Sequence, residues 1–595
     1  MTRGTLRDIL ILTLLSAIVY FIAPASFGLT NWQEAKRALV AREMYDRLKT
    51  DSGAWLVPTD GGRAYLAKPP LIYWCQVALA KVRGARPSEL DLRLTVAIAG
   101  WLGVLATYWA GRRVLLLHDA EHPQPDAERW ARRGAFWGAA MLGTGTLYVR
   151  SSRFGELDVL LVPFTSTAVA LLAIAWKSAI ERKRTNFGAV AGAAACAVGA
   201  AMAKGPPGVL TLGLAAYGGM ALLVAHRSRA ERAMPAAISW LACLAAAAVV
   251  AVSSARQVDE RADWVGVVMM SAMAGWTVWA LLPLVRWAAF KRLFVLFSRT
   301  HPVGVIGAGL GVLWWWTHVV AGRVGNSGLA SSVAEEIEDN LRLLVPDSPL
   351  INLGAAAYGV AMGSAAAIIA IIWIIKDRPR FPLGMSMVFA WAGLGLVAFS
   401  LLGKGVPRYL TPVWPGIAIM GGAWVSAAIR DFRNPVPMRI GWTIGVVVLG
   451  LGQGWWYASG LEAQEHDRSP RAMVREILSR GTSAGELVTF EFSTPAIDYY
   501  AERDVESLLD VVERPGIRFV GPRTLAELKA ELEREPSRRV TMLVRRTQPP
   551  TMDPARAVER LRSLGFEVEA LSMNTEFTID NGRTPVDVVR VSVGK

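Results

Sequence analysis

The chain has 595 residues, of which 53% are hydrophobic and only 19% are charged, and its formal net charge is +15. This composition excludes an ordinary soluble domain and is typical of a polytopic membrane protein. The basic residues stand in short clusters between apolar runs, which indicates membrane topology and excludes the single basic patch of a nucleic-acid-binding surface. The three cysteines are scattered and give neither a disulfide framework nor a zinc-ligand spacing.

Apolar runs long enough to cross a bilayer recur over residues 1–459, since a spanning helix needs about 20 apolar residues. We expect about thirteen spans, and we expect the first to be retained because no convincing cleavage site follows it. Their centres lie near Leu15, Leu102, Leu142, Val169, Cys196, Leu214, Leu244, Val278, Leu310, Ala365, Leu394, Ile419 and Val447.

Basic clusters occupy alternate short loops, among them residues 182–184, 227–232, 291–299, 376–380 and 430–439. Since basic loops stay in the cytoplasm, these loops and the N-terminus are expected inside a bacterial inner membrane. The loops 30–91 and 323–350 and the whole tail after residue 459 are then expected on the periplasmic side.

The tail, residues 460–595, has a high charge density and no spanning run. Strand-like and helix-like segments alternate along it, which predicts a small soluble α/β domain. The strands are expected at Glu486–Phe492, Arg539–Val544 and Val586–Val593, and the helices at Thr524–Glu535 and Pro554–Leu564. Asn581-Gly582 predicts a hairpin before the last strand. The expected fold class is therefore a polytopic α-helical membrane protein, residues 1–459, with a C-terminal α/β domain.

The first outer loop opens with "NWQEAKRALVAREMYDRL", Asn31 to Leu48, in which apolar residues recur at helical spacing among charged ones. The pattern predicts an amphipathic helix that lies flat on the outer leaflet, with its polar face outward. Glu34 then has two interpretations. It is a catalytic acid, or it completes a capping box with Asn31.

Further charged residues stand at the outer ends of apolar segments. Lys68 precedes Pro69-Pro70 and is either a point charge for a lipid phosphate or a snorkelling lysine. Glu156 and Asp158 begin an apolar helix, where the helix dipole favours acids. A carboxylate at the edge of the hydrocarbon is nevertheless costly and usually functional.

Two outer turns carry cations against the basic-inside pattern. "AKGPPG" contains Lys204, and "GKGVPRYLTPVWP" contains Lys404 and Arg408. Snorkelling is one interpretation, and an anion held at the outer face is the other. On the second interpretation Lys68, Lys204, Lys404 and Arg408 are expected to converge on one pocket.

With these motifs in order, the chain resembles the integral-membrane glycosyltransferases of the GT-C fold, of the aminoarabinose-transferase and dolichyl-phosphate-mannose protein-mannosyltransferase type. Gln33-Glu34, Lys36-Arg37-Ala38 and Arg42-Glu43-Met44 fall in register with that family's Asp-Glu, Arg-Tyr-Ala and Arg-Glu-Met. "AKPPLIYW", "ELD", "AKGPPG" and "KGVPRYLTP" match further landmarks in the right order. The likeness covers about Leu12 to Ala458.

One departure bears on the chemistry. The family's first acid aligns with Gln33, whose amide cannot accept a proton at neutral pH. The family's arginine and tyrosine align with Lys36 and Arg37. The family's assignment of the base therefore does not carry over directly.

The resemblance implies sugar transfer from a polyprenyl-phosphate-linked donor to a lipid, glycan or protein acceptor, with inversion at the anomeric carbon. Glu34 is expected to abstract the proton while Asp158 orients the acceptor or stabilises the cationic centre, and the reverse assignment stays open. The residues expected to bind donor or acceptor are Gln33, Lys36, Arg37, Lys68, Glu156, Lys204, Lys404, Arg408 and Tyr409. No cofactor is implied, and no clustered His/Asp set indicates a metal.

Two other functions remain open. A transporter or flippase for a lipid-linked sugar would place ionisable groups near the midplane on broken helices, whereas this chain places them at segment ends. The second is an inactive relative that only binds lipid-linked sugar, which Gln33 suggests because it stands in place of the family's first acid.

Overall fold

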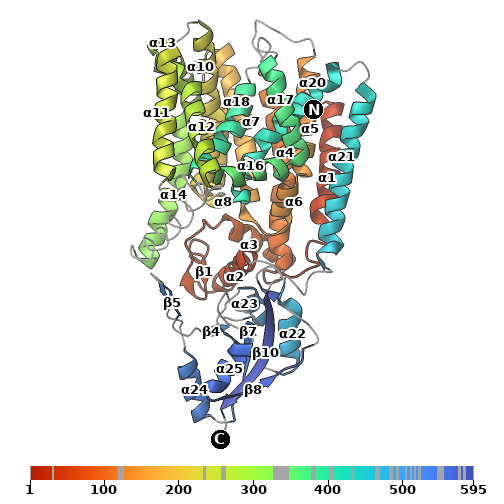
Figure 1. Cartoon of the computed structure of the whole chain (residues 1–595). Helices are drawn as coiled ribbons and strands as arrows, with labels where there is room; N and C mark the ends of the chain where they lie inside the picture. Colours follow the sequence, from red (N-terminus) through yellow and green to blue (C-terminus); the bar gives the residue numbers. More distant parts are fainter. Residues whose placement is uncertain are drawn as a thin grey trace.

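A computed structural model of the chain has a long helical part and a smaller mixed part arranged end to end (Figure 1). The residues it describes are 2–29, 32–117, 126–231, 236–255, 263–325, 348–376, 384–402, 406–431, 435–462, 469–481, 487–490, 495–502, 505–508, 512–514, 517–519, 524–535, 537–545, 555–573, 578–579 and 584–593. The N-terminus lies at the far end of the helical part, and the C-terminus lies at the tip of the mixed part (Figure 1).

The helical part contains these elements in chain order: α1 (Arg3–Ser16), η1 (Ala17–Phe21), α2 (Trp32–Arg47), β1 (Thr59–Asp60), β2 (Arg63–Ala64), α3 (Leu71–Arg83), α4 (Glu89–Leu115), α5 (Ala127–Gly143), α6 (Thr146–Arg153), η2 (Leu157–Leu160), α7 (Leu161–Glu181), α8 (Phe187–Lys204), α9 (Pro206–Gly213), η3 (Leu214–Gly218), α10 (Gly219–Glu231), α11 (Ala236–Ala255), α12 (Asp263–Leu281), η4 (Leu282–Val285), α13 (Trp287–Thr300), α14 (Pro302–Val324), α16 (Ser348–Gly359), α17 (Ala361–Lys376), α18 (Met385–Phe389), η6 (Ala390–Leu394), α19 (Gly395–Leu402), η7 (Pro407–Leu410), α20 (Trp414–Asp431), α21 (Pro435–Trp455) and η8 (Trp456–Gly460).

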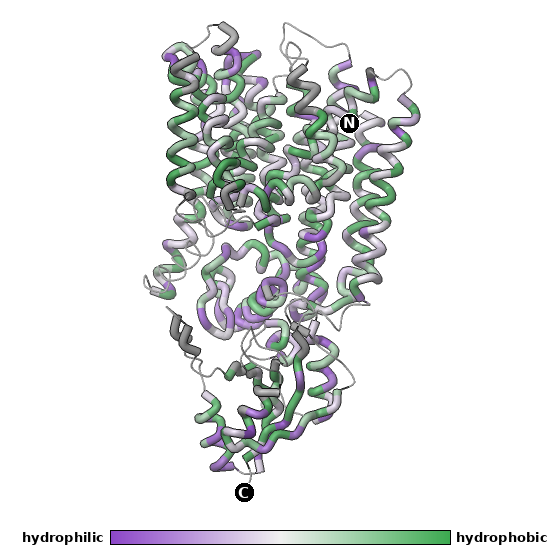
Figure 2. Tube along the Cα trace, viewed as in Figure 1, coloured by the Kyte–Doolittle hydropathy of each residue, from purple (hydrophilic) through white to green (hydrophobic). Residues whose placement is uncertain are grey.

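Nine helices among the described residues are long and apolar enough to cross a membrane, and a bent pair, Pro349–Ala357 with Met362–Ile369, makes a tenth if it is one span. The chain is thus a multi-pass membrane protein, and its long helices are the apolar part of Figure 2. Three of the thirteen predicted spans, near Leu142, Leu244 and Ile419, fall on α5, α11 and α20. In their described residues these helices do not reach the required length or hydropathy.

Helices α5 and α20 instead pack closely against each other. A Cβ atom added at Gly422 would lie 2.2 Å from the carbonyl oxygen of Gly134, and one added at Gly138 would lie 2.8 Å from that of Ala418. Small residues allow two backbones to approach closely, and such contacts hold helices together where lipid supplies no hydrophobic drive.

Helix α2 lies between the helical bundle and the mixed part (Figure 1). Its buried residues include Ala35, Ala38 and Ala41, as the amphipathic pattern predicts. The prediction that its polar face looks outward is wrong for Glu34 and Arg37, which are only 0% and 6% exposed. The cause is that α2 packs against α3, α4 and a helix of the C-terminal part. The predicted capping residue Asn31 lies outside the described residues.

The C-terminal part contains α22 (Arg471–Ser479), β3 (Leu487–Phe490), α23 (Pro495–Ala501), β4 (Glu506–Leu508), β5 (Val512–Arg514), β6 (Ile517–Phe519), α24 (Leu525–Arg534), β7 (Val540–Arg545), α25 (Ala555–Ser563), β8 (Phe566–Ala570), β9 (Thr578–Ile579) and β10 (Thr584–Val593). Its sheet has the order β4-β3-β7-β10-β8, with β9 paired to β10. Strand β3 runs parallel to β4 and β7, and β10 runs antiparallel to β7 and β8. The three predicted strands and two predicted helices are confirmed, and the predicted turn at Asn581-Gly582 lies outside the described residues.

The central strand β7 is buried on both faces of the sheet, whereas the edge strand β8 is largely exposed. Met542 and Val544 of β7 face a core shared with α24 and α25. Leu543, between them, joins the large core that continues through α22 and α23 into the helical part. Successive residues of a strand point to opposite faces, so one strand serves both cores. This arrangement fixes α23 against α2 and against the start of α4.

Candidate active site

Asp158 and Lys204 form a buried ion pair at the ends of two helices. Asp158 lies in η2, just before α7, and its Oδ1 accepts a hydrogen bond from the Nζ of Lys204, the last residue of α8. Their side chains are only 1% and 9% exposed. Gly205 has a φ of +85° and Pro206 begins α9, so the chain turns sharply directly after Lys204.

The second carboxylate oxygen of Asp158, Oδ2, is buried and has no hydrogen-bond partner among the described residues. A buried acceptor without a donor is costly, and in native proteins it calls for an explanation. A hydroxyl group brought to this oxygen would satisfy it. The geometry therefore suits a carboxylate that receives a proton or a hydrogen bond from a substrate hydroxyl.

Further cations gather around this pair from distant parts of the sequence. Lys68 and Arg408 lie close enough to Lys204 to repel its ammonium group electrostatically. The Nζ of Lys204 also lies 3.8 Å from the centre of the Tyr409 ring, a favourable cation–π contact. The structure thus brings together Lys68, Lys204, Arg408 and Tyr409, whereas Lys404 lies outside the described residues. Three cations near one carboxylate leave an excess of positive charge, as an anion-binding site requires.

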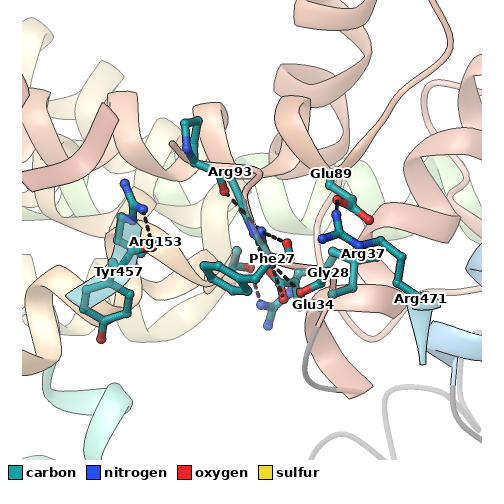
Figure 3. A network of polar contacts seen from close by, with 12 residues as sticks. Phe27, Gly28, Glu34, Arg37, Glu89, Arg93, Arg153, Tyr457 and Arg471 are labelled. Carbon is teal, nitrogen blue, oxygen red and sulfur yellow. Dashed lines mark hydrogen bonds and ion pairs between the residues drawn. The ribbon is translucent and has the colours of Figure 1, made fainter. Parts of the chain in front are cut away.

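Glu34 lies in a different network, which Figure 3 displays. Its two oxygens accept hydrogen bonds from the Nε and Nη2 of Arg93, at 2.9 and 3.3 Å, and both side chains are fully buried. Arg93 belongs to α4 and also donates to the carbonyl oxygens of Pro24, Phe27 and Gly28, at 3.1, 2.5 and 2.9 Å. The guanidinium group of Arg93 therefore ties α2 and the segment before it to α4.

Gly155 connects this network to the loop of Asp158. Its φ is +63°, and a Cβ atom there would lie 3.1 Å from the Cγ of Glu34 and 2.9 Å from a methyl group of Leu92. The carbonyl oxygen of Gly155 accepts a 2.5 Å hydrogen bond from Arg37, one turn beyond Glu34. Two residues of α2 thus hold the backbone three positions before Asp158.

The other predicted binding residues of this region have local partners. The Oε1 of Gln33 accepts a hydrogen bond from Arg37 at 3.0 Å, so this amide helps to orient the Arg37 side chain. Glu156 accepts a hydrogen bond from Ser151 at 2.7 Å. Lys36 forms an ion pair with Asp60 at 2.9 Å and lies over the Tyr65 ring. Gln33 and Arg37 are next to the Asp158 loop, whereas Lys36 is held on the β1–β2 hairpin.

Sequence reasoning missed two buried arginines that organise this region. One is Arg93, described above. The other is Arg153, which donates hydrogen bonds to the carbonyl oxygens of Tyr20, Ile22, Ala23 and Tyr457. A signal existed for Arg93, because an arginine at the start of an apolar run is expensive and needs a partner, whereas Arg153 stands among polar residues beside Arg150. The partners here are mostly backbone carbonyls, which no sequence motif reveals.

The fold has a counterpart among solved structures. ArnT from Cupriavidus metallidurans in the apo state matches with a TM-score of 0.59 and 15% sequence identity, over 97% of this chain and 97% of that chain. The chain has the fold of ArnT. The same protein bound to undecaprenyl phosphate matches with a TM-score of 0.55 and 16% identity, again over 97% of both chains. The ArnT-like GT-C fold expected from the sequence motifs is therefore confirmed.

More distant comparisons add little. The archaeal oligosaccharyltransferase AglB from Archaeoglobus fulgidus matches with a TM-score of 0.41 and 13% identity, over 78% of this chain and 56% of that chain, which is too weak to carry an argument. No protein-family model matches the sequence, and no curated protein matches it significantly. The likeness to ArnT is thus a likeness of fold, and the roles of individual residues rest on their geometry.

Proposed function

We propose that the chain is a glycosyltransferase that moves a sugar from a polyprenyl-phosphate-linked donor to a lipid, glycan or protein acceptor at the outer face of the membrane. The observation that carries the proposal is the meeting of Lys68, Lys204 and Arg408 beside Asp158. The ArnT-like fold supports it, because ArnT has been solved with undecaprenyl phosphate bound.

In the proposed reaction the acceptor oxygen attacks the anomeric carbon while the bond from that carbon to the phosphate oxygen breaks. The acceptor hydroxyl gives up its proton to a carboxylate, and the lipid phosphate leaves with the bonding electrons, so the anomeric centre is inverted. Lys68, Lys204 and Arg408 stabilise the charge that develops on the leaving phosphate, which is where such stabilisation acts most strongly. Lys404 is proposed as a further member of this group, and Tyr409 holds the Lys204 ammonium in place.

Two carboxylates compete for the role of base. Glu34 as the base stays a prediction from the sequence, but its geometry favours a different task, because both of its oxygens face Arg93 in a fully buried pair. Asp158 has a carboxylate oxygen, Oδ2, with no hydrogen-bond partner among the described residues, and it stands next to the cations. We therefore assign the proton abstraction to Asp158 and the anchoring of α2 to Glu34.

The remaining predicted residues shape the site in this proposal. Arg37, oriented by Gln33, holds the Asp158 loop, and Glu156 lies within that loop. Lys36 contributes to the hairpin at the edge of the site. The proposed organisation is a catalytic membrane domain over residues 1–459 and a periplasmic α/β domain over residues 460–595.

The proposal is tested with the purified full chain in lipid nanodiscs and a set of undecaprenyl-phosphate-linked sugars. We expect at least one donor to release undecaprenyl phosphate when an envelope lipid or glycan extract is present as acceptor. A transporter would instead move the intact donor across sealed vesicles without breaking its glycosidic bond. Movement without cleavage contradicts the transferase proposal, and binding with neither cleavage nor movement indicates an inactive relative.

A further inference from the structure

The C-terminal domain touches the helical part at a polar contact centred on Tyr500 of α23. The hydroxyl oxygen of Tyr500 accepts a hydrogen bond from the backbone N–H of Leu29 at 2.7 Å, and the hydroxyl group donates to Glu89, the first residue of α4. Arg471, just after the start of the C-terminal domain, pairs with the other oxygen of Glu89 at 3.3 Å. Figure 3 shows the Glu89–Arg471 pair beside the Glu34–Arg93 network.

Tyr500 and Arg93 bind the same backbone segment, residues 27–29. Leu29 directly follows Phe27 and Gly28, whose carbonyl oxygens accept hydrogen bonds from Arg93. Gly28 itself touches the C-terminal domain: a Cβ atom there would lie 2.2 Å from the Oγ of Ser469 and 2.9 Å from the hydroxyl oxygen of Tyr500. Only a glycine fits between these two groups.

From this segment the contacts lead to the proposed base. Arg93 pairs with Glu34, and Glu34 packs on Gly155, whose carbonyl oxygen is held by Arg37. Asp158 follows three residues later. These contacts are buried and each has a defined partner. A displacement of the backbone at Leu29 would therefore also displace the loop that carries Asp158.

The hydroxyl group of Tyr500 stays protonated in this contact. Burial, and to a lesser degree the nearby Glu89 carboxylate, raises the pKa of Tyr500 well above its usual value. The hydroxyl therefore keeps its proton and serves Leu29 and Glu89 at once. A cavity of about 330 Å³ lies beside it, lined by residues of α2, α4, α22 and α23. These hydrogen bonds, and one from Arg42 of α2 to the carbonyl oxygen of Tyr499 at 2.8 Å, lie at one edge of a domain interface that also contains apolar packing.

We propose that the C-terminal domain positions the catalytic loop, and that Tyr500 is the positioning residue through which it does so. This inference rests on the proposed role of Asp158. It assigns a task to a domain whose sequence motifs indicate none. Of the phosphate-binding cations, Lys204 is paired with Asp158, whereas Arg408 on η7 and Lys68 before α3 lie on other elements. We therefore expect the domain to affect the chemical step more than donor binding.

The test is Tyr500→Phe in the full chain, with Tyr217→Phe as the matched control. Tyr217 also loses one buried hydroxyl bond, to the carbonyl oxygen of Thr300 at 3.1 Å, but it lies on η3, away from this contact. Hydrogen exchange is measured at residues 24–29 and 33–37, and transfer kinetics are measured in parallel. Tyr500→Phe removes both hydrogen bonds of the hydroxyl group. We expect exchange at both segments to rise by roughly tenfold or more, since a single lost hydrogen bond already has about that effect.

We also expect kcat to fall by roughly tenfold while the Kd for undecaprenyl phosphate changes less than about twofold, with no change in the control on any of these measures. Faster exchange at Leu29 alone, or a loss of phosphate affinity equal to the loss of kcat, overturns the inference. If the parent chain transfers no sugar, the proposed function fails, while the exchange at residues 33–37 still decides whether the contact holds α2. Should Tyr500→Phe not fold, Glu89→Gln keeps an acceptor for the hydroxyl and removes the Arg471 pair. A weaker rise in exchange at the same two segments is then expected, and no rise contradicts the inference.

Discussion

The buried pair of Glu34 with Arg93 predicts that Glu34→Gln damages the fold more than the chemistry. Both side chains are at most 1% exposed, and the carboxylate accepts two hydrogen bonds from the guanidinium group. Glutamine keeps one acceptor oxygen but loses the charge, and it turns an N–H group toward Arg93. The arginine then stays buried without the charge of Glu34, and it keeps its three carbonyl partners and the one glutamine oxygen.

Removing one partner of a buried pair typically costs about 3–5 kcal/mol. Because Arg93 keeps its carbonyl partners and glutamine keeps one acceptor, we expect the lower end of that range, about 3 kcal/mol. At 1.36 kcal/mol per factor of ten, this corresponds to a loss of roughly 10²-fold in the folding equilibrium.

The assay is unfolding of the purified chain in mixed micelles, titrated with SDS and followed by tryptophan fluorescence. The matched control is Glu43→Gln on the same helix, whose carboxylate accepts hydrogen bonds from the backbone N–H groups of Gly61 and Gly62 at an exposed position. For the control we expect a loss of about 1 kcal/mol or less.

Transfer is measured on the folded fraction of each variant. We expect Glu34→Gln to lose less than about tenfold in kcat per folded molecule. If Glu34→Gln is as stable as the parent and transfers sugar roughly 10²–10⁴-fold more slowly, Glu34 is the general base and the assignment to Asp158 is wrong.

Four further outcomes follow from the site and the topology. Asp158→Asn is expected to lower transfer by roughly 10²–10⁴-fold with undecaprenyl phosphate binding retained, measured by single-turnover kinetics and titration; an active variant excludes Asp158 as the base. Lys204→Met is expected to weaken binding of undecaprenyl phosphate by roughly 10–100-fold without affecting undecaprenol, and equal effects on both lipids contradict a phosphate contact. Gly155→Ala is expected to destabilise the chain by about 1–3 kcal/mol in the same SDS titration, because its φ of +63° and the contact with Glu34 both oppose a Cβ atom; an unchanged midpoint argues against the close packing. A phosphatase fused after Val593 is expected to be active only on the periplasmic side, and a cytoplasmic signal contradicts the proposed topology.

Much of the fold could be predicted, because long apolar runs indicate membrane helices and the alternation of apolar and polar residues indicates strands. The long apolar runs marked most membrane helices, and alternation marked strands β3, β7 and β10. The count of spans was less secure, because α5 and α20 are stabilised by glycine contacts with each other and need less hydropathy than a lipid-facing helix. Pairing between helices is a tertiary property that composition does not encode.

The site could be predicted in part for a similar reason. The cations Lys204 and Arg408 stood out because they broke the basic-inside pattern, and the pairing of Lys204 with Asp158 gives one of them a defined partner. Glu34 and Asp158 were equivalent in the sequence, since both are acids at helix starts. Only the three-dimensional partners separate them, because Arg93 and Lys204 are far from both in sequence. The Tyr500 contact with Leu29 and Glu89, between residues more than 400 positions apart, left no local signal at all.

The most direct test of the central claim is an experimental structure of the full chain in nanodiscs with undecaprenyl phosphate added. We expect density for the phosphate group within hydrogen-bond distance, roughly 3 Å, of the Nζ of Lys204 and the guanidinium group of Arg408, with Asp158 beside it. A phosphate bound elsewhere, with these side chains turned to lipid or to solvent, contradicts the account.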